Sequence, residues 1–337
     1  MAKMKAAVVT KPGADFEIQE REIPQAGFGE VRIKVHACGV CFSDHLVKDG
    51  LWPGIAYPRV PGHEVAGVVD EVGRGVTEWK KGDRVGTGWH GGHDFVCEFC
   101  RRGDFIACKN EAITGITRDG GYQEYMLVRH EALAGIPDDL DAAEAGPLLC
   151  AGVTTFNSLR HSGATMGDLV GVQGIGGLGH LGIQFAARAG YRVAAIGRGP
   201  ENAALAKKLG ASVYIDTVAT NPAEELAKLG GAKVILATAP NANSIVALIG
   251  GLGVGGKLLV VGAPFEPMEV SVVSLLMARR DIQGWPSGSA MDSEDTLRFS
   301  SQSGVKAMIE KFPLEKVNEA FTRALSGKAQ FRVVLTM

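Results

Sequence analysis

Between positions 172 and 179 the chain reads VQGIGGLG, directly after a short apolar run (169–172) and directly before a segment of helical period (178–189). Gly174, Gly176 and Gly179 have the G-x-G-x-x-G spacing of a turn that joins a strand to a helix. Such a turn lets the backbone, with Gly177 and Leu178 beside it, approach a pyrophosphate at a helix N-terminus. The stretch therefore predicts a dinucleotide site. The alternative is a glycine-rich turn in a packed α/β unit.

Beyond this turn, short apolar runs alternate with helical segments, and the runs lie at 169–172, 192–196, 212–215, 233–238, 257–261 and 281–285. Six such runs predict a doubly wound parallel sheet. Before it, residues 5–151 contain short strand-like runs and glycine-rich turns, which indicate a β-rich region. The alternation stops near 286, and the last fifty residues end in a strand at 331–335. We expect an α/β protein whose tail returns to the first domain.

The end of the second predicted strand bears on the choice between NAD and NADP. An NAD site carries an acidic residue there, which binds the ribose 2′-hydroxyl. This chain has Gly197 and Arg198 at that point, so no carboxylate repels a 2′-phosphate and a guanidinium is available to pair with one. The sequence predicts a preference for NADP(H) over NAD(H). The alternative is that Arg198 is a solvated surface residue.

The composition excludes several classes of protein. The chain has 337 residues, of which 46% are apolar and 21% charged, and its formal net charge is −2. These values are typical of a globular protein of two domains, and they give no electrostatic reason to expect nucleic acid or an anionic membrane as a partner. No apolar stretch has the length and continuity of a membrane span or a secretory signal. We expect a soluble, cytoplasmic protein, whose cysteines then serve as metal ligands, nucleophiles or core residues.

Three separate positions are candidates for a metal site, namely Cys41, His63 and Cys150. Two thiolates and an imidazole with an open fourth position are a known arrangement for catalytic zinc. The three residues are far apart in the sequence, and nothing in their spacing brings them together. Taken singly, each cysteine is equally well explained as a small buried apolar residue.

The surrounding residues connect them. Gly62-His63-Glu64, followed by Gly67, Gly73 and Val76, resembles the signature of the zinc-containing alcohol dehydrogenases of the medium-chain dehydrogenase/reductase family. The resemblance continues through residues 120–125 (GGYQEY), 149–152 (LCAG), the glycine turn and the final RVVLT at 332–336. It implies a β-rich GroES-like catalytic domain (1–153 and 287–337) and a Rossmann dinucleotide-binding domain (154–286).

The resemblance also implies the roles of the residues around a catalytic zinc ion. Cys41, His63 and Cys150 would hold the ion, and Glu64 would lie behind it or bind it transiently. Asp44 would accept the second ring N–H of His63 and so fix its tautomer. Ser43 would bind the substrate oxygen and begin a proton relay.

That relay departs from the family pattern at its end. Many relatives have a histidine five positions after the first zinc cysteine, where this chain has Leu46. Either His45, one residue earlier, replaces it from a shifted position, or the cofactor ribose passes the proton directly to water. The cofactor and substrate contacts that the resemblance implies are Thr154, Val261, Ala263 and Ser287 near the nicotinamide, Arg332 at the phosphates, and Trp52, Trp89 and Trp285 as pocket walls.

A second metal lobe is altered in one ligand. Cys97, Cys100 and Cys108 match the last three cysteines of the family's structural zinc loop, and the first position is Asp94. Carboxylate oxygen is an acceptable zinc ligand, so an Asp94-Cys97-Cys100-Cys108 site is physically reasonable. Two alternatives compete with it: a histidine, His90 or His93, as the fourth ligand, or a lobe without metal.

Together these features predict a zinc-dependent enzyme that transfers hydride between a small alcohol and NAD(P), working as a homodimer or homotetramer. Two other hypotheses are a zinc-free quinone or enone reductase of the same superfamily and a cofactor-binding protein without turnover. The first lacks the cysteine and histidine ligands found here. The second is disfavoured by the presence of Cys41, Ser43, His63 and Cys150 together.

Overall fold

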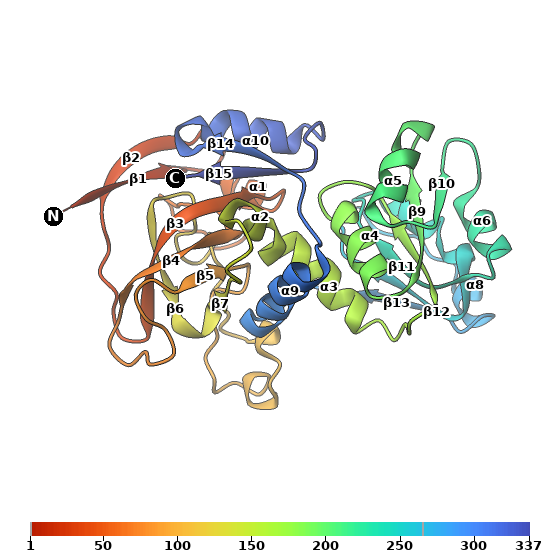
Figure 1. Ribbon diagram of the computed structural model, residues 1–337, viewed down its shortest axis with the longest axis horizontal. Coiled ribbons are helices and arrows are strands. Elements are labelled where there is room, and N and C mark those ends of the chain that lie inside the picture. Colours follow the sequence, from red (N-terminus) through yellow and green to blue (C-terminus); the bar gives the residue numbers. More distant parts are fainter. Residues whose placement is uncertain (1, 265) are drawn as a thin grey trace. The chain divides into compact units, whose positions relative to one another are not determined.

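The computed structural model describes residues 2–264 and 266–337 (Figure 1). The chain divides into two compact units. We call Met1–Val153 with Ser287–Met337 the terminal unit, because it contains both ends of the chain, and Thr154–Pro286 the central unit.

The central unit is built on a parallel six-stranded sheet in the order β10-β9-β8-β11-β12-β13. Its strands are β8 (Leu169–Gln173), β9 (Arg192–Gly197), β10 (Val213–Asp216), β11 (Ala232–Ala237), β12 (Leu252–Val260) and β13 (Asp281–Gly284). Strands β8, β9 and β11 are buried almost throughout, as apolar strands covered on both faces must be. This strand order confirms the predicted doubly wound sheet. The chain first adds strands toward one edge of the sheet, from β8 to β10, and then toward the other edge, from β11 to β13. The point at which the order switches therefore lies between β8 and β11, next to the glycine turn.

Helices connect these strands. They are α4 (Gly179–Arg188), α5 (Ala203–Leu209), α6 (Pro222–Lys228), α7 (Ala242–Val246) and α8 (Val272–Leu276), and α3 (Val153–Arg160) leads into the unit. Asn221 and Asn241 cap α6 and α7 by accepting backbone N–H groups of the first turn. Apolar side chains such as Ile196, Ile235 and Leu258 form the core of the sheet.

The terminal unit is built on a seven-stranded, mainly antiparallel sheet. Its strands follow the order β14-β15-β3-β4-β5-β7, and β6 also pairs with β3. Their bounds are β3 (Glu30–Val40), β4 (Val65–Val72), β5 (Arg84–Thr87), β6 (Tyr125–Arg129), β7 (Ala134–Gly135), β14 (Ile309–Pro313) and β15 (Arg332–Thr336), with β1 (Lys3–Val8) and β2 (Glu17–Glu22) forming a separate pair. Alternating buried residues of β3, including Val31, Ile33 and Val35, pack into its core. Because β15 pairs with β3, the end of the chain returns to the sheet that its beginning started.

The helices of the terminal unit are α1 (Asp44–Lys48), α2 (Ala142–Pro147), α9 (Ala290–Ser303) and α10 (Val317–Leu325). After α2 the backbone widens into one π-helical turn, Leu148–Gly152. Ser289 and Asp292 form a capping box that starts α9. Three strands were not predicted. The sequences of β2 and β14 are largely polar and exposed and lack an apolar pattern, and β7 is only two residues long. No helix of the described residues is long and apolar enough to cross a membrane.

Candidate functional site

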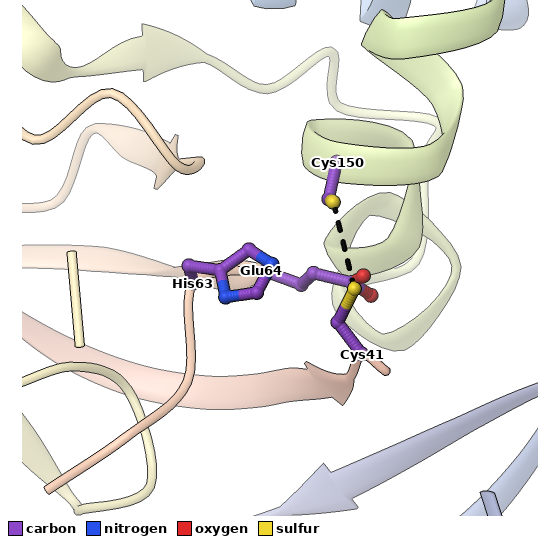
Figure 2. A group of neighbouring side chains, drawn as sticks. All are labelled: Cys41, His63, Glu64 and Cys150. Carbon is purple, nitrogen blue, oxygen red and sulfur yellow. Dashed lines mark hydrogen bonds between the residues drawn. The ribbon is translucent and has the colours of Figure 1, made fainter. Parts of the chain in front are cut away.

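Four side chains of the terminal unit meet in one buried cluster, which we call the first cluster: Cys41, His63, Glu64 and Cys150 (Figure 2). Cys41 directly follows β3, His63 and Glu64 directly precede β4, and Cys150 lies in the π-helical turn. One ligand atom from each residue lies within 4.8 Å of the others. The structure thus brings together the three predicted zinc ligands and Glu64.

Local packing explains why the chain approaches itself so closely here. A Cβ atom at Gly39, on β3, would collide with the Glu64 carboxylate, and one at Gly146 would lie 2.9 Å from the Glu64 backbone oxygen. The two glycines let β3 and α2 close on either side of the segment that carries His63 and Glu64.

The two thiols of the first cluster differ in acidity. Their sulfur atoms are 3.8 Å apart. A hydrogen bond from Cys150, with the charges of His63 and Arg332 nearby, holds the pKa of Cys41 well below its usual range, and the same hydrogen bond together with burial raises the pKa of Cys150. The two thiols therefore titrate as a coupled pair, and the shared hydrogen bond favours a single negative charge between them.

The donors of the first cluster fit a metal ion. His63 is 1% exposed, its Nδ1 atom lies 3.1 Å from the Asp44 carboxylate, and its Nε2 atom is buried without a hydrogen-bond partner. Buried polar atoms are normally paired, so an unpaired ring nitrogen facing two thiols indicates a ligand position. Two thiols and one imidazole suit zinc among the common metals.

A buried ion pair lies beside this cluster. The Arg332 guanidinium donates to the Glu64 carboxylate and, at 3.4 Å, to the Val40 backbone oxygen. Glu64 is fully buried, and burial raises its pKa to about 7 although the Arg332 charge opposes the rise. The sequence did not predict this pair, since its partners are 268 positions apart. The contact of Arg332 with cofactor phosphates stays a prediction.

Asp44 lies where the sequence predicts it, as the partner of His63. It is 1% exposed, and its Oδ2 atom accepts from the Cys41 backbone N–H at 2.8 Å and from the Tyr122 hydroxyl at 2.7 Å. Sequence reasoning missed Tyr122. The GGYQEY stretch contains it, but a tyrosine after two glycines gives no sign that its hydroxyl reaches a carboxylate 78 positions away.

The predicted relay residues stand at the start of α1. Ser43 precedes the helix and is half-buried. The His45 Nδ1 atom lies 2.9 Å from the Asp49 carboxylate, so this ring is oriented by its own helix. Phe42 packs against the His45 ring at 5.3 Å between centroids. The roles of Ser43 and His45 in proton transfer stay predictions.

Two of the three tryptophans predicted as pocket walls stand next to the first cluster. The Trp89 ring meets His63 edge-on at 5.2 Å and Trp52 at 5.7 Å. The third, Trp285, belongs to the central unit, where it stacks on His161 at 5.0 Å. Trp52 and Trp89 therefore place an apolar surface beside the predicted metal ligand.

The second cluster comprises Asp94, Cys97, Cys100 and Cys108, whose ligand atoms also lie within 4.8 Å of one another. Asp94 Oδ1 accepts the backbone N–H groups of Cys97 and Val96, each at 2.9 Å, and Asn110 donates to Oδ2 at 2.7 Å. These hydrogen bonds hold the pKa of Asp94 well below its usual range, so the carboxylate is charged at neutral pH.

The histidines considered as alternative ligands pair with each other, although His93 Nε2 is buried without a hydrogen-bond partner. The His90 Nε2 and His93 Nδ1 atoms are 3.0 Å apart, and His90 Nδ1 lies 2.9 Å from the Glu111 carboxylate. His93 also stacks on Phe105, with 4.1 Å between ring centroids. Neither histidine belongs to the second cluster, whose four members are those predicted with Asp94 in the first place.

In the central unit the glycine turn has the predicted form. Gly174 has φ +91°, and a Cβ atom at Gly179 would collide with the Gly174 backbone oxygen, so these two positions require glycine. A Cβ at Gly176 would meet nothing within 4 Å, and its backbone therefore borders open space. Gly197 and Arg198 end β9, and Val261 and Ala263 follow β12, at the same edge of the parallel sheet. Arg198 is exposed, as a residue that pairs with a phosphate must be before binding.

Comparison with known proteins agrees with this geometry. Residues 27–138 match the alcohol dehydrogenase GroES-like domain, and residues 177–302 match the zinc-binding dehydrogenase domain. The chain belongs to the zinc-type alcohol dehydrogenases of the medium-chain dehydrogenase/reductase family. This confirms the predicted family, the predicted fold class and the assignment as an oxidoreductase of the alcohol dehydrogenase type.

Individual relatives cover nearly the whole chain. Alcohol dehydrogenase patD of Penicillium expansum is 47% identical over 333 residues, which cover 99% of this chain and 97% of that protein. An alcohol dehydrogenase of Geobacillus stearothermophilus is 37% identical over 98% of this chain and 99% of its own length. Among solved structures, a cinnamyl alcohol dehydrogenase of Sorghum bicolor has a TM-score of 0.90 at 31% identity, covering 99% of this chain and 98% of that one.

Proposed function

We propose that this protein is a zinc-dependent alcohol dehydrogenase that transfers hydride reversibly between a primary or secondary alcohol and NADP(H). The observation that carries the proposal is the first cluster, in which two thiols and the unpartnered Nε2 atom of His63 converge. In this proposal the terminal unit holds the metals and the substrate, and the central unit binds the dinucleotide at its glycine turn.

Each residue then has a defined task. Cys41, His63 and Cys150 would hold the zinc ion, which when bound would supply Lewis acidity that makes the alcohol hydroxyl more acidic. Ser43 would accept the hydroxyl proton, and His45 or the cofactor ribose would pass it on to water. The dinucleotide bound at the glycine turn would supply the hydride acceptor.

The residues beside the ligands prepare the site. Asp44 keeps the proton of His63 on Nδ1, so that the Nε2 lone pair faces the two sulfurs. Glu64 and Arg332, buried as a pair, set the electric field behind the thiols. Trp52 and Trp89 form an apolar wall that keeps water from the reacting carbon.

Cofactor choice rests on the end of β9. Gly197 and Arg198 offer no carboxylate to a ribose 2′-phosphate, and the exposed guanidinium is free to move onto one. A solved structure of CAD from Helicobacter pylori, which is 25% identical to this chain, is a complex with NADP(H). Arg198→Asp is expected to lower kcat/KM for NADP⁺ by at least about 10-fold and to spare NAD⁺. Comparable kcat/KM values for both cofactors in the unaltered protein would contradict the preference.

The second cluster is proposed as a structural zinc site with Asp94 as its fourth ligand, because the carboxylate is already ionised and lies among the three thiols. We further propose that the protein is a homodimer or homotetramer of the cytoplasm. Several large apolar side chains of the central unit are exposed on and near α8, namely Val254, Val272, Val273, Leu276 and Met277, and would be covered in an oligomer. Light scattering on the purified protein measures the number of subunits.

The deciding experiment is elemental analysis of the metal content per subunit, run beside oxidation of ethanol and benzyl alcohol with NADP⁺ and with NAD⁺. Two zinc ions with activity support both clusters as proposed. One zinc ion with activity means that the second cluster is empty. Enone reduction without zinc would support the zinc-free reductase instead, and cofactor binding without any turnover would support the non-catalytic protein.

A further inference from the structure

Tyr122 lies deeper in the terminal unit than any proposed ligand, and its hydroxyl ends a chain of hydrogen bonds that leads to the first cluster. The hydroxyl donates to Asp44 Oδ2 at 2.7 Å, and Asp44 Oδ1 lies 3.1 Å from His63 Nδ1. All three side chains are buried, Tyr122 completely. The other ring nitrogen of His63 is the atom that faces the thiols (Figure 2).

The Asp44 carboxylate depends on few donors. Its partners are the Cys41 backbone N–H, the Tyr122 hydroxyl and the His63 ring, and no lysine or arginine of the described residues is ion-paired with it. A buried carboxylate without a lysine or arginine partner depends strongly on such contacts. Losing one of the three leaves the carboxylate less firmly held and so loosens the orientation of the His63 ring.

The backbone around Tyr122 reinforces this arrangement. Residues 120–122 pair with the segment that leads into His63, through bonds from Tyr122 N to Pro61 O at 3.1 Å and from Gly121 N to Gly62 O at 2.9 Å. Gly62 has φ +100°, and a Cβ there would collide with the Tyr122 ring. The ring therefore positions the segment that carries His63, and the hydroxyl positions the carboxylate that His63 binds.

We propose that Tyr122 is a positioning residue for the metal of the first cluster, and that its hydroxyl acts through Asp44 on the orientation of the His63 imidazole. The inference rests on the proposed function in that it takes Cys41, His63 and Cys150 as metal ligands. Burial raises the pKa of Tyr122 well above its ordinary value, so the phenol stays a hydrogen-bond donor at every pH at which the enzyme would work.

The test compares the zinc affinity of both clusters in the same molecule by competition with a chromophoric chelator. Tyr122→Phe keeps the ring and removes only the hydroxyl. It is expected to lower the zinc affinity of the first cluster about 10-fold, the lower end of the effect of residues that support a ligand from behind. The second cluster should keep its affinity and so report an intact fold. Asp94→Ala, which alters only the second cluster, assigns each measured affinity to its site.

A matched control is Tyr214→Phe in the central unit. The Tyr214 hydroxyl also makes one hydrogen bond, to the Gly199 backbone oxygen at 2.5 Å. This variant loses the same group from the central unit, which contains no member of either cluster, and it is expected to leave both zinc affinities unchanged.

A double-mutant cycle separates a positioning role from a merely structural one. If Tyr122 acts through Asp44, Tyr122→Phe has less than about a 2-fold effect on zinc affinity once Asp44→Ala has removed the acceptor. If Asp44→Ala does not fold, Asp44→Asn replaces it, and the effect of Tyr122→Phe should shrink severalfold. An unchanged affinity in Tyr122→Phe, or an effect that persists fully without the carboxylate, overturns the proposal. If the unaltered first cluster binds no zinc, the proposed function itself fails, which is a separate outcome.

Should Tyr122→Phe not fold, incorporation of 3-fluorotyrosine gives a near-isosteric phenol that is a stronger donor. The N–H proton of the zinc-loaded His63 ring is then expected to shift in the NMR spectrum. A resonance that does not move would overturn the coupling.

Discussion

The two thiol clusters of the terminal unit are assembled in opposite ways. The first takes its members from the end of β3, the segment before β4 and the π-helical turn, which are distant in the sequence. The second lies within one loop, residues 94–108, and two of its four members are half-exposed. The first cluster therefore depends on the completed sheet, whereas the second depends mainly on the conformation of its own loop.

Their electrostatic surroundings differ as well. The first contains a fully buried carboxylate, Glu64, whose pKa burial raises to about 7, and a buried guanidinium beside it. In the second, backbone N–H groups and Asn110 hold the pKa of Asp94 well below its usual range. The surroundings of the first cluster are typical of a site whose charge changes during a reaction. Those of the second are typical of a site that only retains a metal ion.

The largest effect is expected from Cys41→Ala. Loss of one of three ligands removes the metal of the first cluster, and kcat/KM for alcohol oxidation should fall by at least about 1,000-fold, which corresponds to about 4 kcal/mol. Metal analysis should show one zinc ion remaining per subunit, in the second cluster, and cofactor affinity should be little changed. Activity retained in this variant would reject a metal mechanism.

Asp94→Ala tests the second cluster. It removes the proposed fourth ligand and the acceptor for two backbone N–H groups of the loop. We expect loss of one zinc ion and a melting temperature lower by roughly 5–10 °C, as a loss of about 2–3 kcal/mol produces in a unit of this size. At a temperature where the variant is folded, kcat should stay within about 2-fold. If kcat also fell strongly at a temperature where the variant is folded, the two clusters would not be independent.

The pH dependence of the metal-free protein distinguishes the clusters by sign. The folded protein binds the Glu64 proton more tightly than the unfolded chain does. The stabilisation from this group is therefore complete below the unfolded pKa of 4.5 and is lost as the pH rises through about 7. Chemical denaturation at pH 5 and pH 8 should show a decrease on the order of 2 kcal/mol that Glu64→Gln lacks.

Asp94 should behave in the reverse way in the same experiment. Its pKa is lowered in the folded protein, so its stabilisation is present above the unfolded pKa and is lost only in acid. Asp94→Asn should therefore leave the difference in unfolding free energy between pH 5 and pH 8 unchanged. If Glu64→Gln and Asp94→Asn changed the difference in unfolding free energy between pH 5 and pH 8 equally, the contrast between the clusters would be contradicted.

The smallest effect is expected from His93→Gln. The residue is buried and paired with His90 outside the ligand group, so both zinc ions should remain. Loss of its hydrogen bond and ring stacking should lower the free energy of unfolding by about 1–2 kcal/mol. Release of the second zinc ion would instead make His93 a ligand and reopen the assignment of Asp94.

Features that depend on a local or periodic pattern of residues could be predicted from the sequence. The six parallel strands and the turn with Gly174 and Gly179 follow from apolar runs and glycine spacing, and the structure confirms them. The polar strands β2 and β14 carry no such pattern and were missed. The second cluster could be foreseen because its cysteines lie within one loop and match the family's structural zinc loop.

The first cluster could be assembled only through the family resemblance, because no local pattern joins Cys41 to Cys150. The contacts of Tyr122 with Asp44 and of Arg332 with Glu64 escaped both approaches. Each contact joins residues that only the folded sheet brings together. In each, nothing in the sequence indicates which residue the polar atom will bind.

The return of β15 to β3 also sets an order of events during synthesis of the chain. The central unit is continuous in sequence, so all of its strands have left the ribosome when residue 286 has emerged. The sheet of the terminal unit still lacks β14 and β15 at that moment, and Glu64 has no Arg332 to neutralise it. On the ribosome, the central unit is thus free to fold first, whereas the sheet of the terminal unit is completed only when its last strand has emerged.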